Sequence, residues 1–327
     1  MEEIMSGEAT PCQTSALLVA LKKKGVTVDE VTVFAQVMKE KSRRITPKVS
    51  GVLLDTCGTG GDLTKTFNVS TTSALVIAGA GVSVAKHGTR SFTSKCGSAD
   101  LLESLGLNLE MSPERVKSSI EEVGIGFLYA PVFHPAMLNV ATIRREIGVR
   151  TVFNILGPLT NPAGARAQLL GVYDPSLLEL MCEAAKRLGC KSVMTVYALD
   201  GIDEIAITGK TLVAQVNGSN KLEKGEIDPS QLGLRKATSK EIGGSNPTEN
   251  AQLSLRILSG RLHRDDACLQ MVLLNAAAGL VLSQMACDLR DGLELARKVI
   301  EDGEALESLR LLVEYSGGSL ERIDNLS

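Results

Sequence analysis

The sequence contains no tryptophan, and aromatic residues make up only 3% of it. The hydrophobic core must therefore be built from aliphatic side chains. Histidine is scarce, with three copies, and none of the seven cysteines forms a CxxC pair. Zinc sites need clustered cysteine and histidine ligands, so this spacing argues against a zinc site. An odd number of scattered cysteines is typical of reduced thiols, which predicts a cytoplasmic protein.

Long apolar runs and a strong charge imbalance are also missing. The acidic N-terminus lacks the apolar core of a signal peptide, and polar residues interrupt the apolar stretches 71–85 and 271–285. Both stretches are shorter than the roughly 20 residues that cross a bilayer, so no membrane partner is expected. The net charge of −3 argues against a nucleic-acid partner, which normally requires a basic surface.

Glycine, by contrast, is plentiful, and the element pattern divides the chain in two. Helices are predicted over residues 1–46, where Thr10 and Thr27 each begin a capping-box pattern. After Pro47, short strands alternate with helices. The strands are predicted at 52–55, 82–85 and 193–197, and the helices at 73–80, 98–106, 112–124, 134–147 and 174–189. This alternation predicts a mostly parallel sheet with helices on both faces.

The last third of the chain has a different pattern. Alternating residues up to Val216, followed by the turn signal Asn217-Gly218, predict a β-hairpin. Residues 219–246 are polar and are predicted to form loops, and the chain from Asn246 onward is predicted to be helical. The fold class expected from the residues is therefore α/β.

A glycine cluster, Gly58-Thr59-Gly60-Gly61-Asp62, directly follows the first predicted strand. Glycines at such a point let backbone N–H groups approach phosphate oxygens closely. The cluster lacks both the lysine of a Walker A loop and the spacing of a dinucleotide fingerprint. A tight strand-to-helix turn explains these glycines equally well, so this loop alone does not decide between the two interpretations.

Two further segments strengthen the phosphate interpretation. Asn68-Val69-Ser70-Thr71 places polar side chains at a helix start, where free N–H groups and the helix dipole attract anions. Lys86-His87-Gly88-Thr89-Arg90 follows a strand and leads into a hydroxyl-rich loop before Ser98. Cations on either side of a glycine suit an anionic ligand. Plain helix capping and a solvated charged loop are the alternatives.

Acidic and basic residues elsewhere complete the candidate set. The adjacent carboxylates Asp203 and Glu204 lie in a loop after a strand, where they can hold Mg²⁺ together with water and ligand phosphates. Arg144 lies near the end of a predicted helix and is of interest only if that helix lines a cleft. Each of these features, taken alone, is more often an ordinary surface feature.

Taken in order, the segments GTGGD, TFNVST, KHGTRSFTSKCGSAD, HPAMLNVATIRREIGVRTVFNILGPLTNP and DGIDE resemble the anthranilate phosphoribosyltransferase family. The resemblance extends from about residue 4 to the C-terminal helices. It implies a large α/β domain with a mostly parallel central sheet plus a small α-helical domain, of the nucleoside phosphorylase and phosphoribosyltransferase type. The helical domain would comprise 1–46 with a contribution from about 130–148, and the large domain 50–129 and 149–327. The family also implies a homodimer and an active site between the two domains.

The resemblance implies an activity as well. The enzyme would transfer the phosphoribosyl group of 5-phosphoribosyl 1-diphosphate to the amine of anthranilate, with Mg²⁺ as cofactor, in tryptophan biosynthesis. Catalytic roles are implied for Lys86, His87 and Arg144. Donor binding is implied for Gly58, Gly61, Asp62, Thr66, Asn68, Val69, Ser70, Thr71, Lys86, His87, Gly88, Thr89, Arg90, Ser94 and Ser98. Anthranilate binding is implied for Gly58, Thr89, Arg144, Gly157 and Pro158, and Mg²⁺ binding for Ser70, Asp203 and Glu204.

The sequence departs from the family pattern in two of its motifs. Leu63 stands where members have a glycine after GTGGD, and Thr89 replaces the asparagine of KHGN. Because Thr89 keeps a hydroxyl but lacks the amide, a phosphoribosyltransferase with a different aromatic acceptor is one alternative. A pyrimidine nucleoside phosphorylase of the same fold needs no Asp-Glu magnesium pair and fits less well. A catalytically silent relative that binds a ligand or nucleic acid is the remaining alternative, which the net charge disfavours.

Overall fold

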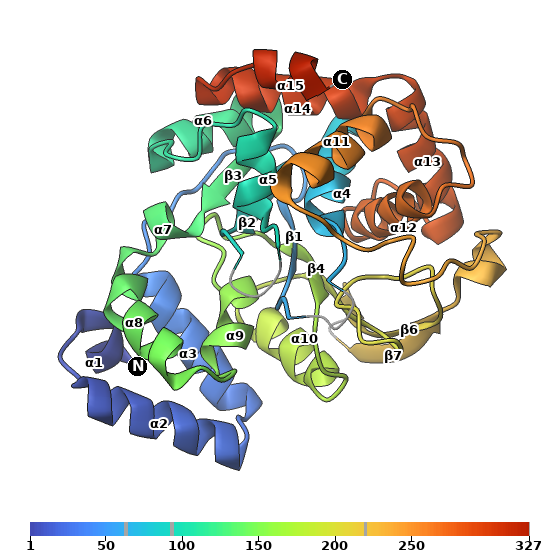
Figure 1. Ribbon diagram of the computed structural model, residues 1–327. Coiled ribbons are helices and arrows are strands. Elements are labelled where there is room, and N and C mark those ends of the chain that lie inside the picture. Colours follow the sequence, from blue (N-terminus) through green and yellow to red (C-terminus); the bar gives the residue numbers. More distant parts are fainter. Residues whose placement is uncertain (62–64, 92–94, 219–220, 327) are drawn as a thin grey trace.

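The computed structural model describes residues 1–61, 65–91, 95–218 and 221–326. The predicted site residues Asp62 and Ser94, and the family departure Leu63, lie outside the described residues. The chain folds into a group of N-terminal helices beside a larger α/β body (Figure 1). This arrangement confirms the predicted fold class.

The N-terminal helices begin where the capping patterns predict. They are α1 (Glu2–Ser6), α2 (Pro11–Lys24) and α3 (Val28–Glu40). Thr10 caps α2 in a capping box with Gln13, and Thr27 caps α3 in a second box with Glu30. Both α1 and α2 contact α8 (Leu138–Ile147), which lies about 100 residues further along the chain. The helical group is therefore built from two separate segments.

A seven-stranded sheet forms the centre of the larger body, in the order β3-β2-β1-β4-β5-β6-β7. Its strands are β1 (Leu54–Gly58), β2 (Val84–Gly88), β3 (Ile125–Tyr129), β4 (Ala167–Gly171), β5 (Ser192–Ala198), β6 (Thr211–Asn217) and β7 (Leu222–Ile227). The pairings from β3 to β5 are parallel, and those of β6 and β7 are antiparallel. The sheet is thus mostly parallel, as predicted.

Alternating side chains of the strands enter two hydrophobic cores. On β4, Leu169 lies in the core beneath α4 (Val69–Gly79) and α12 (Ala267–Leu282), whereas its neighbour Leu170 lies in the core that includes α10 (Leu177–Arg187). Successive residues of a strand point to opposite faces, so the sheet separates the two cores. The second core continues into α2 and α3 and joins the helical group to the sheet.

Some predicted boundaries and elements were wrong. The prediction placed β1 and β2 about two residues early, because the glycines that end both strands were taken as loop. It missed β3 and β4, which are short and buried and therefore show no alternation. The segment Leu222–Ile227 was predicted to be loop but forms the edge strand β7, whose exposed Glu and Lys residues suit an unpaired edge.

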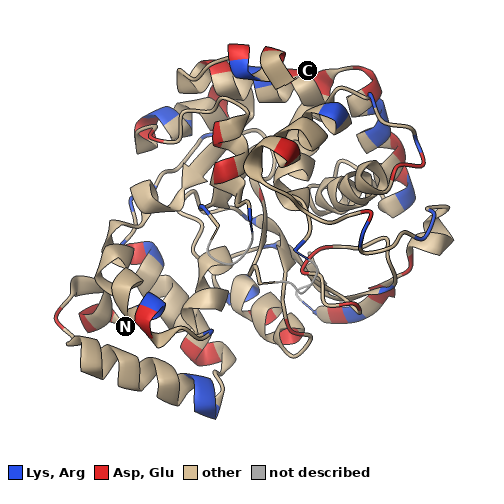
Figure 2. Ribbon diagram, viewed as in Figure 1, with Lys and Arg blue, Asp and Glu red and all other residues tan. Residues whose placement is uncertain are grey.

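Most of the remaining helices belong to the larger body (Figure 1). They are α5 (Ser98–Ser104), α6 (Pro113–Val123), α7 (Ala130–Phe133), α9 (Phe153–Leu156), α11 (Pro247–Leu258), α13 (Leu289–Glu301), α14 (Glu304–Ser316) and α15 (Glu321–Leu326), with 3₁₀ turns η1 (Pro135–Met137), η2 (Gly157–Leu159) and η3 (Pro229–Leu232). Both signs of charge are interspersed on α6, α13 and α14 (Figure 2). No helix in the described part of the chain is long and apolar enough to cross a bilayer.

Candidate active site

The topology marks the carboxyl ends of the central strands as the place for a ligand. Strand β1 lies between β2 and β4, so the chain runs outward from β1 in one direction and later continues outward from β4 in the other. In open α/β sheets, ligands bind outside the carboxyl ends of the strands at such a switch point. Here β1 ends at Gly58 and β4 ends at Gly171.

The loop that carries Asp203 lies directly across these two strand ends. A Cβ atom on Gly58 would come within 2.5 Å of the Asp203 Oδ2, and one on Gly171 would come within 1.5 Å of the Asp203 carbonyl oxygen. Both distances are too short for any side chain. The two glycines therefore permit a close approach that brings the acidic pair to the switch point.

Each carboxylate of the acidic pair accepts a backbone hydrogen bond. The N–H of Gly60 donates to Asp203 Oδ2 at 2.8 Å, and the N–H of Ser70 donates to Glu204 Oε1 at 3.2 Å. Ser70 lies in the first turn of α4, where N–H groups have no helical partner. The acidic pair thus connects the glycine loop to the start of α4, which the sequence analysis had singled out separately.

The chemistry of this donor set suits a hard cation. Asp203 and Glu204 are 7% and 8% exposed, so both carboxylates are largely removed from water. No group of three or more His, Cys, Asp or Glu side chains that could hold a metal occurs among the residues that the structure describes. Mg²⁺ is commonly held by one or two carboxylates, with waters and substrate phosphates filling the other positions. The residues present fit that mode of binding.

Lys86 lies on β2 and is 2% exposed. Its Nζ donates to the carbonyl oxygen of Thr56 and, at 3.4 Å, to that of His87. The Thr56 hydroxyl donates to the carbonyl oxygen of Ser70 at 2.9 Å. The ammonium group is thereby fixed close to the start of α4 and to the strand that precedes the glycine loop.

Asp55 places a buried carboxyl group near Lys86, and the sequence analysis did not identify it. Its Oδ1 accepts from the His87 N–H at 3.2 Å, and its Oδ2 accepts from Asn161 Nδ2 at 2.8 Å. Burial raises the pKa of Asp55, while the nearby charge of Lys86 lowers it. A carboxylate within a strand gave no signal in the sequence, because its partners come from distant segments.

A pair of histidine rings lies beside this network. The centroids of His87 and His134 are 5.1 Å apart, and both side chains are buried. Burial lowers the pKa of His87 well below its usual value and that of His134 to about 4. Both rings are therefore neutral at pH 7, and Nε2 of His87 has no hydrogen-bond partner among the described residues. In the sequence, His134 stands out only as the first residue of the HPAMLN segment.

Other predicted donor-binding residues converge around the start of α4. Asn68 precedes the helix, and its Nδ2 donates to the Cys96 carbonyl oxygen at 3.2 Å. Val69 is buried, and the buried Thr71 hydroxyl has no hydrogen-bond partner among the described residues. Thr66 forms an isolated antiparallel bridge with Gly243. The polar end of α4 thus faces the loops that follow β1 and β2.

The loop after β2 brings Gly88 and Ser98 together. A Cβ atom on Gly88 would lie 2.9 Å from the Ser98 Cβ, and the Thr89 carbonyl oxygen accepts from the Ala99 N–H at 3.3 Å. Arg90 differs from the other predicted donor-binding residues in where its side chain points. Its guanidinium forms ion pairs with α5 residues Asp100 at 3.0 Å and Glu103 at 2.7 Å. The structure therefore directs the charge of Arg90 toward α5.

Three of the five predicted acceptor residues, Arg144, Gly157 and Pro158, lie on the segment that leaves the helical group. Arg144 is in the last turn of α8, and its guanidinium carbon lies 5.5 Å from the centroid of the Phe153 ring. Burial lowers the pKa of Arg144. Phe153 begins α9, and Gly157 and Pro158 follow it in η2. The Pro158 carbonyl oxygen accepts from Gln168 Nε2 at 2.6 Å, which fixes this turn against β4.

Arg150 contacts the glycine loop, and the sequence analysis did not identify it. Its Nη2 donates to the Gly61 carbonyl oxygen at 2.5 Å, and its guanidinium carbon lies 4.3 Å from the centroid of the Tyr173 ring. Tyr173 in turn donates its N–H to the Thr59 hydroxyl at 3.0 Å. The only available signal was a third arginine shortly after Arg144 and Arg145, which is weak evidence in a surface segment.

Comparisons with known proteins identify the family of the chain. The family profile described as "Glycosyl transferase family, a/b domain" matches residues 50–306, and "Glycosyl transferase family, helical bundle domain" matches residues 1–42. The anthranilate phosphoribosyltransferase of Pelotomaculum thermopropionicum is 50% identical over 97% of this chain and 90% of its own length. That of Methanocorpusculum labreanum is 49% identical over 97% of this chain and 92% of its own length.

Solved structures give the same result. The anthranilate phosphoribosyltransferase of Thermus thermophilus superposes with a TM-score of 0.90 at 44% identity, covering 97% of this chain and 93% of its own. The Saccharomyces cerevisiae enzyme in complex with PRPP and Mg has a TM-score of 0.87 at 31% identity, covering 94% of this chain and 85% of its own. Since both its sequence and its fold match, this chain belongs to the anthranilate phosphoribosyltransferase family.

Proposed function

We propose that this chain transfers the phosphoribosyl group of 5-phosphoribosyl 1-diphosphate to the amine of anthranilate and releases diphosphate, as a step of tryptophan biosynthesis. The observation that carries the proposal is the meeting of four features at the switch point of the sheet. These are the glycine loop, the start of α4, the buried ammonium of Lys86 and the acidic pair. Together they form a site for a diphosphate and its metal ion.

The donor would be held by the first three of these features. Backbone N–H groups of the glycine loop and of the first turn of α4 suit the diphosphate oxygens. The side chains proposed to contribute are those of Thr66, Asn68, Ser70, Thr71, Lys86 and Ser98, with Gly58, Gly61, Val69, Gly88 and Thr89 contributing backbone. Support comes from the unpartnered Thr71 hydroxyl and from the fixed ammonium of Lys86. Asp62, Arg90 and Ser94 stay predicted donor residues.

Mg²⁺ would be held by Asp203 and Glu204 with the Ser70 hydroxyl. Bound there, it would neutralise the charge that develops on the leaving diphosphate. The support is the donor set itself, together with the yeast relative, whose structure contains PRPP and Mg. Lys86 would add a second positive charge from the β2 side, within a region that excludes water.

The acceptor would bind between Arg144 and the turn that carries Gly157 and Pro158. A half-buried arginine suits a carboxylate, because its guanidinium can donate two parallel hydrogen bonds. His87 and His134 are neutral and buried, so they suit the edge or face of an aromatic ring. A yeast relative was solved in complex with 4-fluoroanthranilate, which supports an aromatic acid as the acceptor.

The reaction then needs positioning more than a dedicated base. The amine nitrogen of the acceptor attacks C1 of the ribose, the bond from C1 to the diphosphate oxygen breaks, and the nitrogen loses a proton. Holding the amine in line with that bond supplies most of the acceleration. The side chains of this chain bind the two substrates from opposite sides and exclude water between them.

The decisive test is loss of anthranilate fluorescence on addition of phosphoribosyl diphosphate and Mg²⁺. We expect turnover that requires all three components, with phosphoribosyl anthranilate and diphosphate formed in equal amounts. Donor-dependent thermal stabilisation without turnover would reject anthranilate and favour another aromatic acceptor, for which Thr89 would be the first residue to examine. Absence of both effects would reject phosphoribosyl transfer itself.

The assembly and boundaries of the domains are part of the proposal. We propose a helical domain of residues 1–46 and about 130–148, supported by the contacts of α1 and α2 with α8.

A homodimer through this domain is supported by large apolar side chains that it exposes, among them Val33 at 55% and Leu138 at 76%. Light scattering of Leu138→Glu should show a monomer. The presence of seven cysteines as thiols supports a cytoplasmic location.

A further inference from the structure

One polar side chain lies at the centre of an otherwise apolar helix. Asn275 is in the middle of α12 and is 0% exposed, with Leu274, Ala276 and Ala277 beside it in the sequence, all equally buried. An amide removed from water in this way costs free energy unless all its polar atoms are hydrogen-bonded. The Asn275 amide therefore requires hydrogen-bond partners, and its role there is one that an aliphatic side chain could not fill.

That partner is the backbone directly after the acidic pair. The Ile205 N–H donates to Asn275 Oδ1 at 3.0 Å, and Asn275 Nδ2 donates to the Ile205 carbonyl oxygen at 2.8 Å. A further bond from Nδ2 to the Met271 carbonyl oxygen, at 2.9 Å, fixes the amide on its own helix. The amide thus forms hydrogen bonds with both the N–H and the carbonyl oxygen of Ile205, as a neighbouring strand would.

Helix α12 also packs against α4, the helix that anchors Glu204 from the other side. The Ser73 hydroxyl of α4 donates to the Val272 carbonyl oxygen of α12 at 3.1 Å, and the two helices are in extensive contact. Glu204 therefore lies between two anchors, the Ser70 N–H on α4 and the Asn275 amide on α12. The relative position of these helices sets where its carboxylate lies.

From this geometry we infer that Asn275 is a positioning residue for the metal-binding carboxylates. It contacts neither substrate nor metal, and it acts by fixing the backbone of Ile205 so that Asp203 faces the glycine loop and Glu204 faces the start of α4. The inference rests on the proposed function, because it assigns Asn275 to the proposed Mg²⁺ site. Residues that orient metal ligands commonly change metal affinity by about 10–100-fold when they are replaced.

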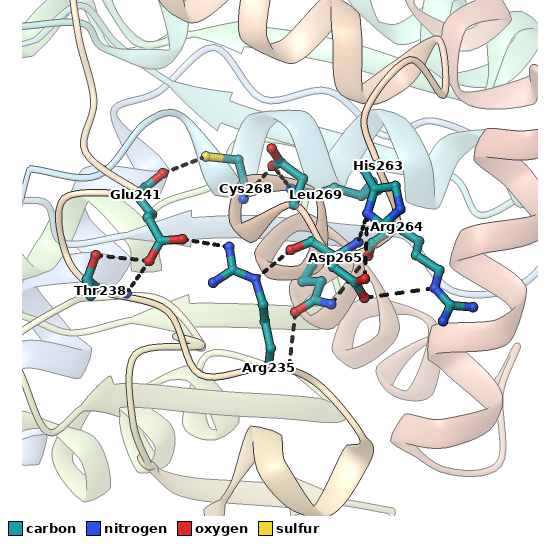
Figure 3. Close-up of polar contacts among 10 residues, drawn as sticks. Arg235, Thr238, Glu241, His263, Arg264, Asp265, Cys268 and Leu269 are labelled. Atoms are coloured by element: carbon teal, nitrogen blue, oxygen red, sulfur yellow. Dashed lines mark hydrogen bonds and ion pairs between the residues drawn. The ribbon is translucent and has the colours of Figure 1, made fainter.

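The test compares Asn275→Leu with a matched variant on the same helix. Gln270→Leu removes an amide that is 4% exposed and also bonds to the backbone, at Arg235 N–H and the Arg264 carbonyl oxygen. Figure 3 shows that region, the cluster of Arg235, Glu241 and Asp265 near the start of α12. The two hydrogen bonds of the Gln270 amide go to Arg235 and Arg264, whereas those of Asn275 go to Ile205 and Met271, so Gln270→Leu controls for the loss of a buried amide.

Two measurements use the enzyme without turnover. Calorimetry of Mn²⁺ with diphosphate should show an affinity about tenfold lower for Asn275→Leu and unchanged for Gln270→Leu. Hydrogen exchange of the Ile205 amide, followed without metal, should be faster in Asn275→Leu alone. Wild-type metal affinity together with wild-type Ile205 exchange in Asn275→Leu would overturn the inference. Equal losses of metal affinity in both variants would overturn it as well.

Two additions keep the result interpretable. If Asn275→Leu does not fold, Asn275→Asp keeps an acceptor for the Ile205 N–H, loses the donor, and should show the same weakening of metal affinity. Wild-type metal affinity in Asn275→Asp would overturn the inference. Neither measurement involves anthranilate. If the wild-type enzyme does not use anthranilate but Asn275→Leu still binds the metal more weakly than wild type, the inference stands and only the proposed acceptor is rejected. A wild-type protein without metal–diphosphate binding overturns it together with the metal site.

Discussion

The carboxylate of Asp203 accepts a 2.8 Å hydrogen bond from the backbone N–H of Gly60, 143 positions earlier in the sequence. The bond joins the loop proposed to hold the diphosphate with the pair proposed to hold the metal. Since Glu204 is bonded to the start of α4 in the same way, neither half of the donor site can be displaced alone. This coupling makes the backbone around the acidic pair as important as its side chains.

Gly171→Ala should therefore abolish the activity although it removes no functional group. The added methyl would meet the Asp203 carbonyl oxygen at 1.5 Å, so the acidic loop must move away from the strand ends. We expect a loss of activity of about a hundredfold or more, as for a misplacement of about 1 Å in an active site. The expected loss of stability is about 1–3 kcal/mol. Steady-state kinetics over a range of Mg²⁺ concentrations and urea unfolding would measure both.

Gly209→Ala is the matched control for that change. Gly209 lies in the same loop region, its φ is not in the left-handed range, and a Cβ there would meet nothing within 4 Å. The variant should retain wild-type kinetics and stability. A Gly171→Ala enzyme with the activity of Gly209→Ala would show that the close approach of Asp203 is not required.

The double variant Asp203→Asn with Glu204→Gln tests the metal assignment directly. Amide oxygens in place of carboxylates keep the size of the side chains but remove the charge that would hold Mg²⁺. We expect no Mg²⁺-dependent turnover above background, with donor-dependent thermal stabilisation also lost. Asp200→Asn, in the same loop region, serves as a control carboxylate variant. Unchanged activity of the double variant would reject these residues as metal ligands.

The sequence predicted the parts of this site better than their arrangement. Local signals such as the capping boxes at Thr10 and Thr27 were correct, because a cap depends on residues three positions apart. The glycine loop and the acidic pair were identified as motifs. That Gly60 and Asp203 share a hydrogen bond could not be predicted, because it depends on strand order, which local patterns do not encode.

The residues that were missed share one property. Asp55, Arg150 and Asn275 each act through a partner far away in the sequence, and each is common in its local setting. A buried carboxylate in a strand, a surface arginine after a helix and an asparagine in an apolar helix carry no motif. Strands β3 and β4 were missed for a related reason, since buried strands lack the alternation that reveals a half-exposed one.

Acid should destabilise the protein between about pH 6.5 and pH 4, in part through His134. Burial lowers its pKa from 6.5 in the unfolded chain to about 4 in the folded protein. Between these values the unfolded state binds the proton and the folded state does not, so stability rises with pH across this window and is lost as pH falls. The full shift corresponds to about 3 kcal/mol. Urea unfolding of wild type and His134→Asn at several pH values would measure the difference in slope.

His263→Gln provides the control for this prediction. The His263 side chain is 78% exposed, so His263→Gln removes a histidine without removing a buried ring and should change the stability at pH 7 by less than about 0.5 kcal/mol. His134→Asn should flatten the curve below pH 6.5 whatever its effect on stability at pH 7. A slope equal to that of wild type in His134→Asn would show that the ring accepts a proton in the folded state.

Arg150→Lys should weaken donor binding while leaving the acceptor unaffected. Lysine keeps the positive charge but loses the planar group that both donates to the Gly61 carbonyl oxygen and stacks on Tyr173. We expect the KM for phosphoribosyl diphosphate to rise about fivefold, with the KM for anthranilate within about twofold of wild type. Arg145→Lys, at an exposed position of α8, should change neither value. Equal increases in both KM values would contradict a role confined to the glycine loop.

Arg144→Ala should show the opposite selectivity. Its guanidinium lies against the Phe153 ring, next to the turn with Gly157 and Pro158, and on the segment that connects the helical group to the sheet. Removing a charged hydrogen-bonding partner from a half-buried site costs about 1.5–3 kcal/mol, so the KM for anthranilate should rise about 10–100-fold. The KM for the donor should change much less. Because α8 could also shift when Arg144 is removed, Arg144→Lys separates the two causes: it keeps a cation for the carboxylate and should recover part of the affinity. Equal effects of Arg144→Ala on both substrates would assign the residue to the packing of α8 and not to the acceptor.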